Sequence, residues 1–319
     1  MSQFLLTGTN GFIGQALAGR LERDGAQVCG AIRGAAAEPS GLHGCLRVTD
    51  DFANIGDVWP AHLRADCVVH LAARVHVLNE SAADPLAAFR RTNVAGTLRV
   101  AEAAARAGVR RFVYVSSIKA VAEQDDGAPL KETDVPEPLD PYGVSKLEAE
   151  LALREYCAAI GMECVIVRPP LVYGPGVRAN FLALMDTLAR GVPLPLGAVH
   201  ARRSLISVDN LVDALVECAR RPEAAGQTFH VGDGADLSVP ELLRTLARHL
   251  QVPCRLIPVP VSWLRAAGRL TGRTEQVSRL VGGLSVDIRH IGNTLGWTPP
   301  MPVDEGLRAT ANWYRTGRR

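Results

Sequence analysis

The stretch FLLTGTNGFIGQAL, residues 4–17, decides the fold. Its apolar start predicts a short buried strand, and the apolar spacing from Ile13 onward predicts a helix. Three glycines stand between them, where they permit a tight turn, close approach of the backbone to a pyrophosphate, and close helix–strand packing. The pattern predicts a dinucleotide site at the helix N-terminus; the alternative is a tight turn without a ligand. The residues expected to line the site are Gly8, Asn10, Gly11, Phe12, Ile13 and Gly14.

Short apolar runs and helical stretches alternate through the first half of the chain. This alternation predicts an α/β fold, a Rossmann doubly wound parallel sheet with helices on both faces. Strands are expected at 4–7, 27–32, 67–71, 111–116 and 164–168, and helices at 13–24, 86–107 and 142–160.

The composition of the chain changes after residue 170, where prolines and glycines become frequent. We expect a dinucleotide-binding domain at 1–170 and a smaller, mostly helical C-terminal substrate domain at 171–319. Segments near 205–232 are expected to pack back on the sheet. The elements expected in this half are helices near 180–190 and 209–220, strands at 205–208 and 228–231, and further helices from 239 onward.

Composition excludes several classes of protein. The chain is 47% hydrophobic and 21% charged, as in soluble globular proteins, and its net charge of +2 is too small to argue for nucleic acid or an anionic membrane. Seven cysteines without Cys-x-x-Cys spacing indicate buried thiols in a reducing compartment, with neither a disulfide framework nor a metal site. No apolar run approaches about 18 residues, and the N-terminus lacks a signal-peptide pattern. We therefore expect a cytoplasmic protein without membrane insertion.

The end of the second expected strand bears on which dinucleotide binds. An acidic residue there would hold the adenosine 2′-hydroxyl of NAD. Ile32 stands at that position and Arg33 follows, and an arginine suits the 2′-phosphate of NADP. The sequence therefore favours NADP(H) over NAD(H), unless Arg33 is only a solvated loop arginine. Asp50 or Asp51, after the third strand, could accept a hydrogen bond from the adenine amino group.

The stretch DPYGVSKLEAE, residues 140–150, places Tyr142 and Lys146 four apart at the start of a helix. Most such pairs are surface decoration, but this chain has only three lysines among 35 basic residues. An ammonium beside a phenol stabilises the phenolate and lowers its pKa, which suits a general acid or base. The pair therefore predicts catalytic machinery.

Five motifs in order resemble the extended short-chain dehydrogenases/reductases, the nucleotide-sugar epimerase/dehydratase/reductase group. They are TGTNGFIG (7–14), HLAA (70–73), YVSSIKAV (114–121), YGVSK (142–146) and RPPLVYGPG (168–176). The resemblance implies that Tyr142 is the catalytic acid/base and that Lys146 holds the nicotinamide ribose and lowers the tyrosine pKa. It implies that Ser117, or its neighbour Ser116, bonds the substrate oxygen.

The same resemblance implies further contacts. Cofactor contacts are expected, besides those above, from Leu71, Ala72, Ala73, Asn93 and Pro169. Contacts with a UDP-sugar are expected from Ser116, Ser117, Asn180, Arg203 and Asp287. Asn93 could equally be a buried polar residue satisfied by backbone, and Arg203 a solvated charge. Members of the family often dimerise through two helices of the cofactor domain, here the helices expected at 86–107 and 142–160, so a homodimer is expected.

Departures from the family pattern narrow the expected reaction. Dehydratases of this group carry Asp-Glu where this chain has Ile118 and Lys119, so a 4,6-dehydratase is excluded. The missing strand-end acid favours a reductase that consumes NADPH. The local sequence resembles that of bacterial surface-polysaccharide (lipopolysaccharide O-antigen) enzymes. These enzymes reduce the C4 ketone of a UDP-2-acetamido-2,6-dideoxy-hexos-4-ulose, giving UDP-N-acetylquinovosamine. The alternatives are a UDP-hexose 4-epimerase with tightly bound NAD (acting on UDP-glucose or UDP-GlcNAc) and, more remotely, a non-catalytic NADP-sensing regulator.

Overall fold

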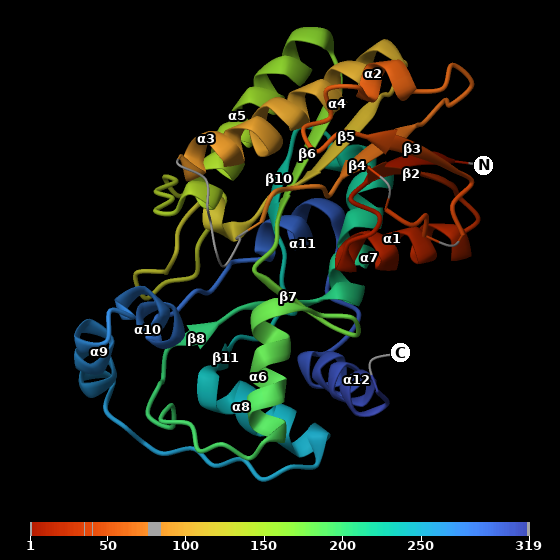
Figure 1. The fold of residues 1–319 in the computed structure, drawn as a ribbon. Helices are drawn as coiled ribbons and strands as arrows, with labels where there is room; N and C mark the ends of the chain where they lie inside the picture. The colour runs from red at the N-terminus through yellow and green to blue at the C-terminus, as the bar shows by residue number, and fades with distance from the viewer. Residues whose placement is uncertain (1, 35, 40, 76–83, 318–319) are drawn as a thin grey trace.

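A seven-stranded parallel sheet, with six strands between residues 3 and 168 and a seventh at 228–230, forms the centre of the computed structural model, which describes residues 2–34, 36–39, 41–75 and 84–317 (Figure 1). The strand order is β10-β6-β5-β4-β1-β2-β3, so the chain winds outward in both directions from β1. This confirms the predicted doubly wound α/β fold. The strands are β1 (Gln3–Thr7), β2 (Gln27–Arg33), β3 (Gly44–Val48), β4 (Cys67–His70), β5 (Arg111–Val115), β6 (Glu163–Arg168) and β10 (Thr228–His230).

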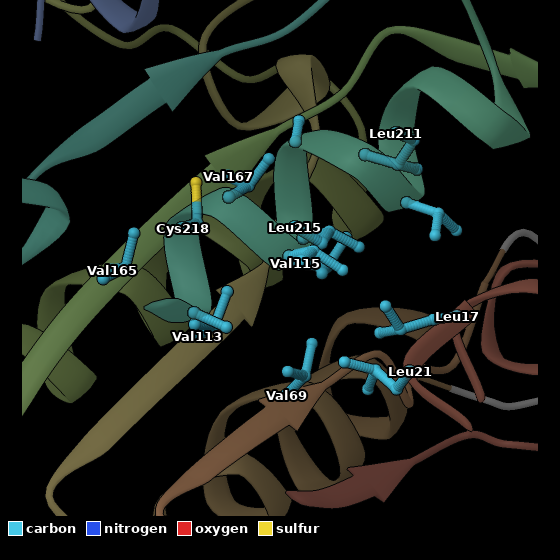
Figure 2. Close-up of a cluster of buried hydrophobic side chains, with 14 of the residues drawn as sticks. Leu17, Leu21, Val69, Val113, Val115, Val165, Val167, Leu211, Leu215 and Cys218 are labelled. Carbon is cyan, nitrogen blue, oxygen red and sulfur yellow. The ribbon is translucent and has the colours of Figure 1, made fainter. Parts of the chain in front are cut away.

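Helices cover both faces of the sheet because both faces of its strands are apolar. Figure 2 shows one face, where valines of β5 and β6 meet α1 (Phe12–Arg23) and α7 (Val208–Arg220). On the other face lie α2 (Ile55–Val58), α4 (Gly96–Arg106) and α5 (Pro141–Ile160). The carboxyl ends of β1, β4 and β5 therefore meet at one edge, where ligands of such folds bind.

The single helix predicted at 86–107 is wrong in one respect. The structure has α3 (Pro85–Arg90), a π-helical turn at Arg91–Ala95, and then α4. The turn contains Asn93, which is buried and bonded to the backbone of the segment after β4. The spacing of apolar residues cannot predict such a turn, because the turn depends on this tertiary contact. π-Helical turns are frequent at functional sites.

The second half adds two small sheets and a third core. β7 (Leu171–Tyr173) pairs with β9 (Leu205–Ser207), and β8 (Arg202–Arg203) pairs with β11 (Leu237–Ser238). β10 and α7 belong to the large sheet and its covering layer. Across the described part of the chain, no helix has the length and apolar character needed to span a membrane. The remaining helices are α6 (Ala179–Ala189), α8 (Val239–Leu250), α9 (Val261–Leu270), α10 (Thr274–Val281), α11 (Arg289–Leu295) and α12 (Val303–Arg315), with 3-10 turns at Ile118–Ala120 and Pro222–Ala224.

Candidate active site

The glycine loop joins β1 to α1 in a shape that only glycine allows at two positions. Gly8 has φ +74°, and a Cβ there would lie 3.0 Å from the Ala72 backbone nitrogen. A Cβ on Gly14 would overlap the carbonyl oxygen of Gly8, so the first turn of α1 packs directly against the end of β1. No side chain caps the α1 N-terminus at Gly11, and the first turn holds no acid. The loop therefore offers uncapped N–H groups to an anion, which fits the pyrophosphate of a dinucleotide.

The other predicted loop residues surround this turn. Phe12 and Ile13 begin α1 and are partly buried in the core below it. The Asn10 amide donates to the Ala37 carbonyl oxygen at 3.2 Å, which links the loop to the segment after β2. Within the described residues, the buried side-chain oxygens of Thr9 and Asn10 have no hydrogen-bond partner. Unpaired polar atoms beside an uncapped helix end are consistent with a polar ligand there.

Arg33 and Asp50 meet at the open end of β2. Arg33 ends the strand with its side chain 59% exposed, and its Nη1 lies 3.9 Å from the Asp50 carboxylate. Ile32, at the expected acid position, is buried in the core. The strand end thus presents one exposed cation accompanied by one exposed acid, where the sequence alone predicted an arginine for a 2′-phosphate.

His70, at the end of β4, links the end of β1 to helix α4 through buried hydrogen bonds. The Thr7 hydroxyl lies 2.8 Å from Nδ1 and also accepts from the Ala72 amide at 3.1 Å. On the other side, Nε2 lies 3.0 Å from the Thr97 hydroxyl, which donates to the Asn93 carbonyl oxygen. These bonds fit the tautomer protonated at Nε2. Burial, reinforced by the Lys146 charge, lowers the pKa of His70 to about 3, so the ring stays neutral.

These bonds fix the backbone of residues 71–73, where cofactor contacts from Leu71, Ala72 and Ala73 were predicted. All three residues lie partly exposed beside the glycine loop. The sequence reasoning recognised the HLAA motif but gave His70 no role. The signal was present: a histidine ending an otherwise apolar strand needs buried partners.

Asn93 positions the site from within the protein. Its amide oxygen accepts from the Arg74 amide at 2.7 Å, and its nitrogen donates to the Arg74 carbonyl and to Ser145 Oγ. Ser145 Oγ in turn donates to the Tyr142 carbonyl oxygen at 2.8 Å. Asn93 is 1% exposed and bonded to backbone, so it joins the end of β4 to the first turn of α5. This matches the alternative weighed for Asn93 in the sequence.

Tyr142 and Ser117 come together where α5 begins. Asp140 caps the helix by accepting from the Gly143 amide at 2.6 Å, and Gly143 lies directly against the Lys119 carbonyl oxygen, so the first turn is fixed. Burial raises the pKa of Tyr142 to about 12; a hydrogen bond with Ser117 opposes the rise and the Asp140 charge adds to it. Tyr142 is therefore a protonated phenol at neutral pH in this state.

The structure places Ser117, the serine preferred from the sequence, and its neighbour Ser116 in different surroundings. Ser117 is partly exposed and bonds with Tyr142, whereas Ser116 is 4% exposed and its hydroxyl has no partner among the described residues. Ser116 donates its amide to the Val167 carbonyl oxygen, and the Pro169 carbonyl accepts from Ile118 two positions later. Ser117 is thus the serine that meets Tyr142. Pro169 packs directly behind this turn.

Lys146 lies one helical turn after Tyr142 and is 1% exposed. Its Nζ donates to the Val115 carbonyl oxygen at 2.7 Å and lies 4.1 Å from the centre of the Tyr114 ring. Burial lowers the pKa of Lys146 to about 7, and the nearby Glu150 charge opposes that shift. In this state the pKa of Tyr142 lies above its ordinary value, because burial outweighs the Ser117 hydrogen bond, and the Lys146 ammonium is bound to the Val115 carbonyl oxygen. That Lys146 lowers the pKa of Tyr142 once a cofactor is bound stays a prediction.

A buried ion pair continues the same row of α5. Glu150, one turn after Lys146, is 1% exposed, and Arg168 Nη2 lies 2.6 Å from its carboxylate. A second bond joins Arg168 Nε to Glu150 Oε1 at 3.0 Å. The sequence reasoning missed this pair. An acid at the i, i+4, i+8 spacing from Tyr142 was the available signal, but its partner on β6 is visible only in three dimensions.

A cavity of about 350 Å³ opens beside Tyr142. Phe89 and Asp140 line one side, and α10 contributes Ser278 and Arg279 to the other. Arg279 lies 3.9 Å from Glu123 and 4.0 Å from Asp140, so it is a cation among carboxylates at the mouth of the cavity. Sequence reasoning gave α10 no role, because nothing local ties this helix to Tyr142.

Lys119, the residue at the dehydratase acid position, joins the same cluster. Its Nζ lies 2.8 Å from the Glu123 carboxylate and 2.5 Å from that of Asp140. Ile118, beside it, is buried in a small apolar cluster. The two positions therefore hold a paired ammonium and a core side chain in place of the two carboxylates expected of a dehydratase.

The predicted substrate contacts fall into two groups. Arg203 and Asp287 meet at the segment 282–287. Arg203 Nε donates to the Gly282 carbonyl oxygen at its start at 2.9 Å, and Asp287, at its end, donates its amide to the Leu130 carbonyl oxygen at 2.8 Å. Burial lowers the pKa of Arg203, and the Asp287 carboxylate binds Arg289. Asn180 lies elsewhere, exposed in the first turn of α6.

Comparisons with known proteins add to this geometry. Residues 4–232 match the model of the NAD dependent epimerase/dehydratase family. A UDP-glucose 4-epimerase of Vibrio cholerae is 43% identical over 97% of this chain and 94% of its own length. A GDP-6-deoxy-D-mannose reductase of Pseudomonas aeruginosa is 28% identical over 80% of this chain and 82% of its own length. The structure of MoeE5 in complex with UDP-glucose and NAD is 27% identical, with a TM-score of 0.79 and 100% of both chains covered.

Proposed function

The chain belongs to the NAD-dependent epimerase/dehydratase family of extended short-chain dehydrogenases/reductases, and on that premise we propose that it is a UDP-hexose 4-epimerase with tightly bound NAD. The observation that carries the proposal is the meeting of Tyr142 with Ser117, one turn from Lys146 and beside a cavity. The similarity to the Vibrio cholerae epimerase supports this reaction better than the C4 reductase that the sequence favoured. The intact Tyr–Lys pair argues against a sensor without chemistry.

Each residue of the site has a defined task in this reaction. When bound, the nicotinamide ring supplies the hydride acceptor and donor. Tyr142 takes the proton of the C4 hydroxyl at its Oη and later returns it, while Ser117 orients the same oxygen. The pKa of about 12 at Tyr142 opposes the first of these steps. Lys146 favours it once its Nζ turns from the Val115 carbonyl toward the groove, because an ammonium stabilises the phenolate.

Arg33 favours a second candidate, NADPH-dependent reduction of the C4 ketone of a UDP-2-acetamido-2,6-dideoxy-hexos-4-ulose. Its exposed guanidinium at the end of β2 suits a 2′-phosphate, and no acid occupies position 32. Tyr142, protonated at neutral pH, is already in the form that gives a proton to a reduced ketone. Both candidates use Ser117, Tyr142 and Lys146, and they differ in whether the cofactor is recycled or consumed.

The experiment offers the purified enzyme UDP-glucose and UDP-GlcNAc without added cofactor and follows their C4 epimers by chromatography. Epimer formation in many turnovers is expected. A lack of epimer, together with NADPH consumption on a UDP-4-keto-6-deoxy sugar, would replace the epimerase with the reductase. No turnover in either assay would contradict both candidates.

A further inference from the structure

Helix α9 carries an apolar face that no other described part of the chain covers. Trp263 and Leu270 are 71% and 89% exposed, and Ala266 and Ala267 between them are exposed as well. These four positions follow the i, i+3, i+4, i+7 spacing of one helix face. Figure 1 shows α9 at the outer edge of the molecule, beside α10. The face therefore points away from the body of the protein.

The opposite face of α9 is already used. Val261 and Leu264 pack against the third core, and a Cβ on Gly268 would lie 2.9 Å from the Val277 side chain of α10. The helix is thus held in place by its inner face. Its outer tryptophan and leucine are not required for that packing, so their exposure needs another explanation.

The charged residues in and around α9 are all basic. Residues 242–274 contain six arginines and neither aspartate nor glutamate, while the rest of the chain holds 29 basic and 33 acidic residues. The net charge of +2 therefore hides a basic segment on an otherwise acidic protein. Arg265, Arg269 and Arg273 are exposed, and within the described residues none of the three forms an ion pair. Arg269 lies three positions after Ala266, at the edge of the outer apolar face, Arg265 lies on the flank of the helix away from Trp263, and Arg273 follows the end of α9.

We propose that the outer face of α9 docks on an anionic lipid bilayer. A short amphipathic helix with tryptophan and leucine on one side, and with arginines on its polar flank and just after its end, is the pattern of an interfacial helix. Tryptophan prefers the headgroup level, and each arginine near an anionic surface adds to binding. A second copy of the chain fits less well, because pairing two such faces brings six unpaired arginines together.

The docking is peripheral, and it goes beyond the proposed reaction without depending on it. α10, the partner of α9, contributes Ser278 and Arg279 to the cavity beside Tyr142. The docked surface therefore lies one helix away from the candidate active site, which would act close to the membrane. Electrostatic attraction of this kind weakens as salt rises, because the Debye length shortens.

Flotation of the full chain with vesicles tests the proposal. Vesicles of phosphatidylcholine with about one third phosphatidylglycerol should carry the protein upward at low salt, and phosphatidylcholine alone should not. Arg265→Glu/Arg269→Glu should weaken binding more than about tenfold, and Trp263→Ser/Leu270→Ser should abolish it. Failure of the wild type to float with anionic vesicles at low salt would overturn the proposal.

Matched variants elsewhere on the surface give the controls. Arg23→Glu/Arg64→Glu changes the same charge at two exposed positions, and Val135→Ser removes a side chain that is 80% exposed. Both controls should float like the wild type, and all variants should retain wild-type turnover in solution. Equal losses in the controls would mean that general charge, and not α9, binds the vesicles.

Tryptophan emission separates a lipid surface from an acidic protein partner. Trp263 should shift to the blue and be quenched by brominated lipid when anionic vesicles are added, and Trp263→Phe should lose most of that signal. Binding to polyglutamate with no vesicle-dependent shift would assign the face to an acidic polypeptide and contradict the membrane proposal.

Discussion

The two ends of the candidate cofactor site differ in how firmly the protein holds their side chains. At the chemical end, Lys146 is 1% exposed and bonded to the Val115 carbonyl, and Glu150 is locked to Arg168 beneath it. At the expected adenosine end, Arg33 is 59% exposed and lies 3.9 Å from Asp50, which is 87% exposed. In the proposed enzyme, buried and interlocked contacts would therefore hold the reacting groups, whereas one solvent-exposed pair would bear on the choice of dinucleotide. Reaction type and cofactor choice should therefore respond separately to mutation.

The largest expected effect lies at the chemical end. Tyr142→Phe removes the group that moves the proton and should lower turnover by about 10²–10⁴-fold, with nucleotide retention unchanged. Steady-state kinetics and the bound nucleotide content measure the two effects. Tyr156→Phe, on the same helix, is the matched control and should behave as wild type. Normal turnover of Tyr142→Phe would remove Tyr142 from the mechanism.

The buried pair should show the next largest effect, on stability. Glu150→Gln leaves the Arg168 guanidinium buried without its carboxylate, which should lower the free energy of unfolding by about 3–5 kcal/mol. Chemical denaturation with urea measures it. Glu155→Gln, exposed on the same helix, should change the free energy of unfolding little. Similar values for both variants would mean that the ion pair does not hold the chemical end together.

His70 should make the stability of the fold depend on pH in the acidic range. Its pKa falls from 6.5 to about 3 on folding, so the unfolded chain takes up a proton first as pH falls. The free energy of unfolding should therefore decrease between about pH 6.5 and 3, by about 1.4 kcal/mol per unit from this group, with no contribution above that range. His70→Gln does not titrate and should have a shallower slope. Parallel pH profiles of the two proteins would contradict a neutral His70 in the fold.

The smallest effect is expected at the adenosine end. Arg33→Ala should weaken NADPH binding by about tenfold, because a charge-assisted bond to the 2′-phosphate is lost, and should leave NADH binding nearly unchanged. Titration calorimetry on nucleotide-free protein measures both affinities. Arg64→Ala controls for the loss of an exposed arginine. Equal losses for the two nucleotides would make Arg33 a bystander and leave Asp50 as the candidate selector.

Sequence reasoning located the parts of the site that depend on local spacing. The glycines at 8, 11 and 14 and the Tyr142–Lys146 pair are separated by fixed steps along one loop and one helix, so their juxtaposition follows from the chain itself. The alternation of strands and helices likewise predicted the doubly wound sheet that the structure has.

What remained hidden depends on segments distant in sequence. Three groups of contacts each join different elements: the Glu150–Arg168 pair, the His70 network and the Arg279 cluster. The spacing of residues along the chain does not predict them. For the same reason, spacing alone did not show that burial raises the pKa of Tyr142 in this state. Spacing placed an ammonium nearby, but burial and the Val115 carbonyl decide what that ammonium does.

The most direct test of the central claim is to denature the purified protein and identify the released nucleotide by mass. The account of an epimerase that recycles its cofactor predicts NAD, in a ratio near one per chain. Release of NADP, or an empty protein that binds NADPH more tightly than NADH, would contradict it and assign the site to a reductase that consumes its cofactor.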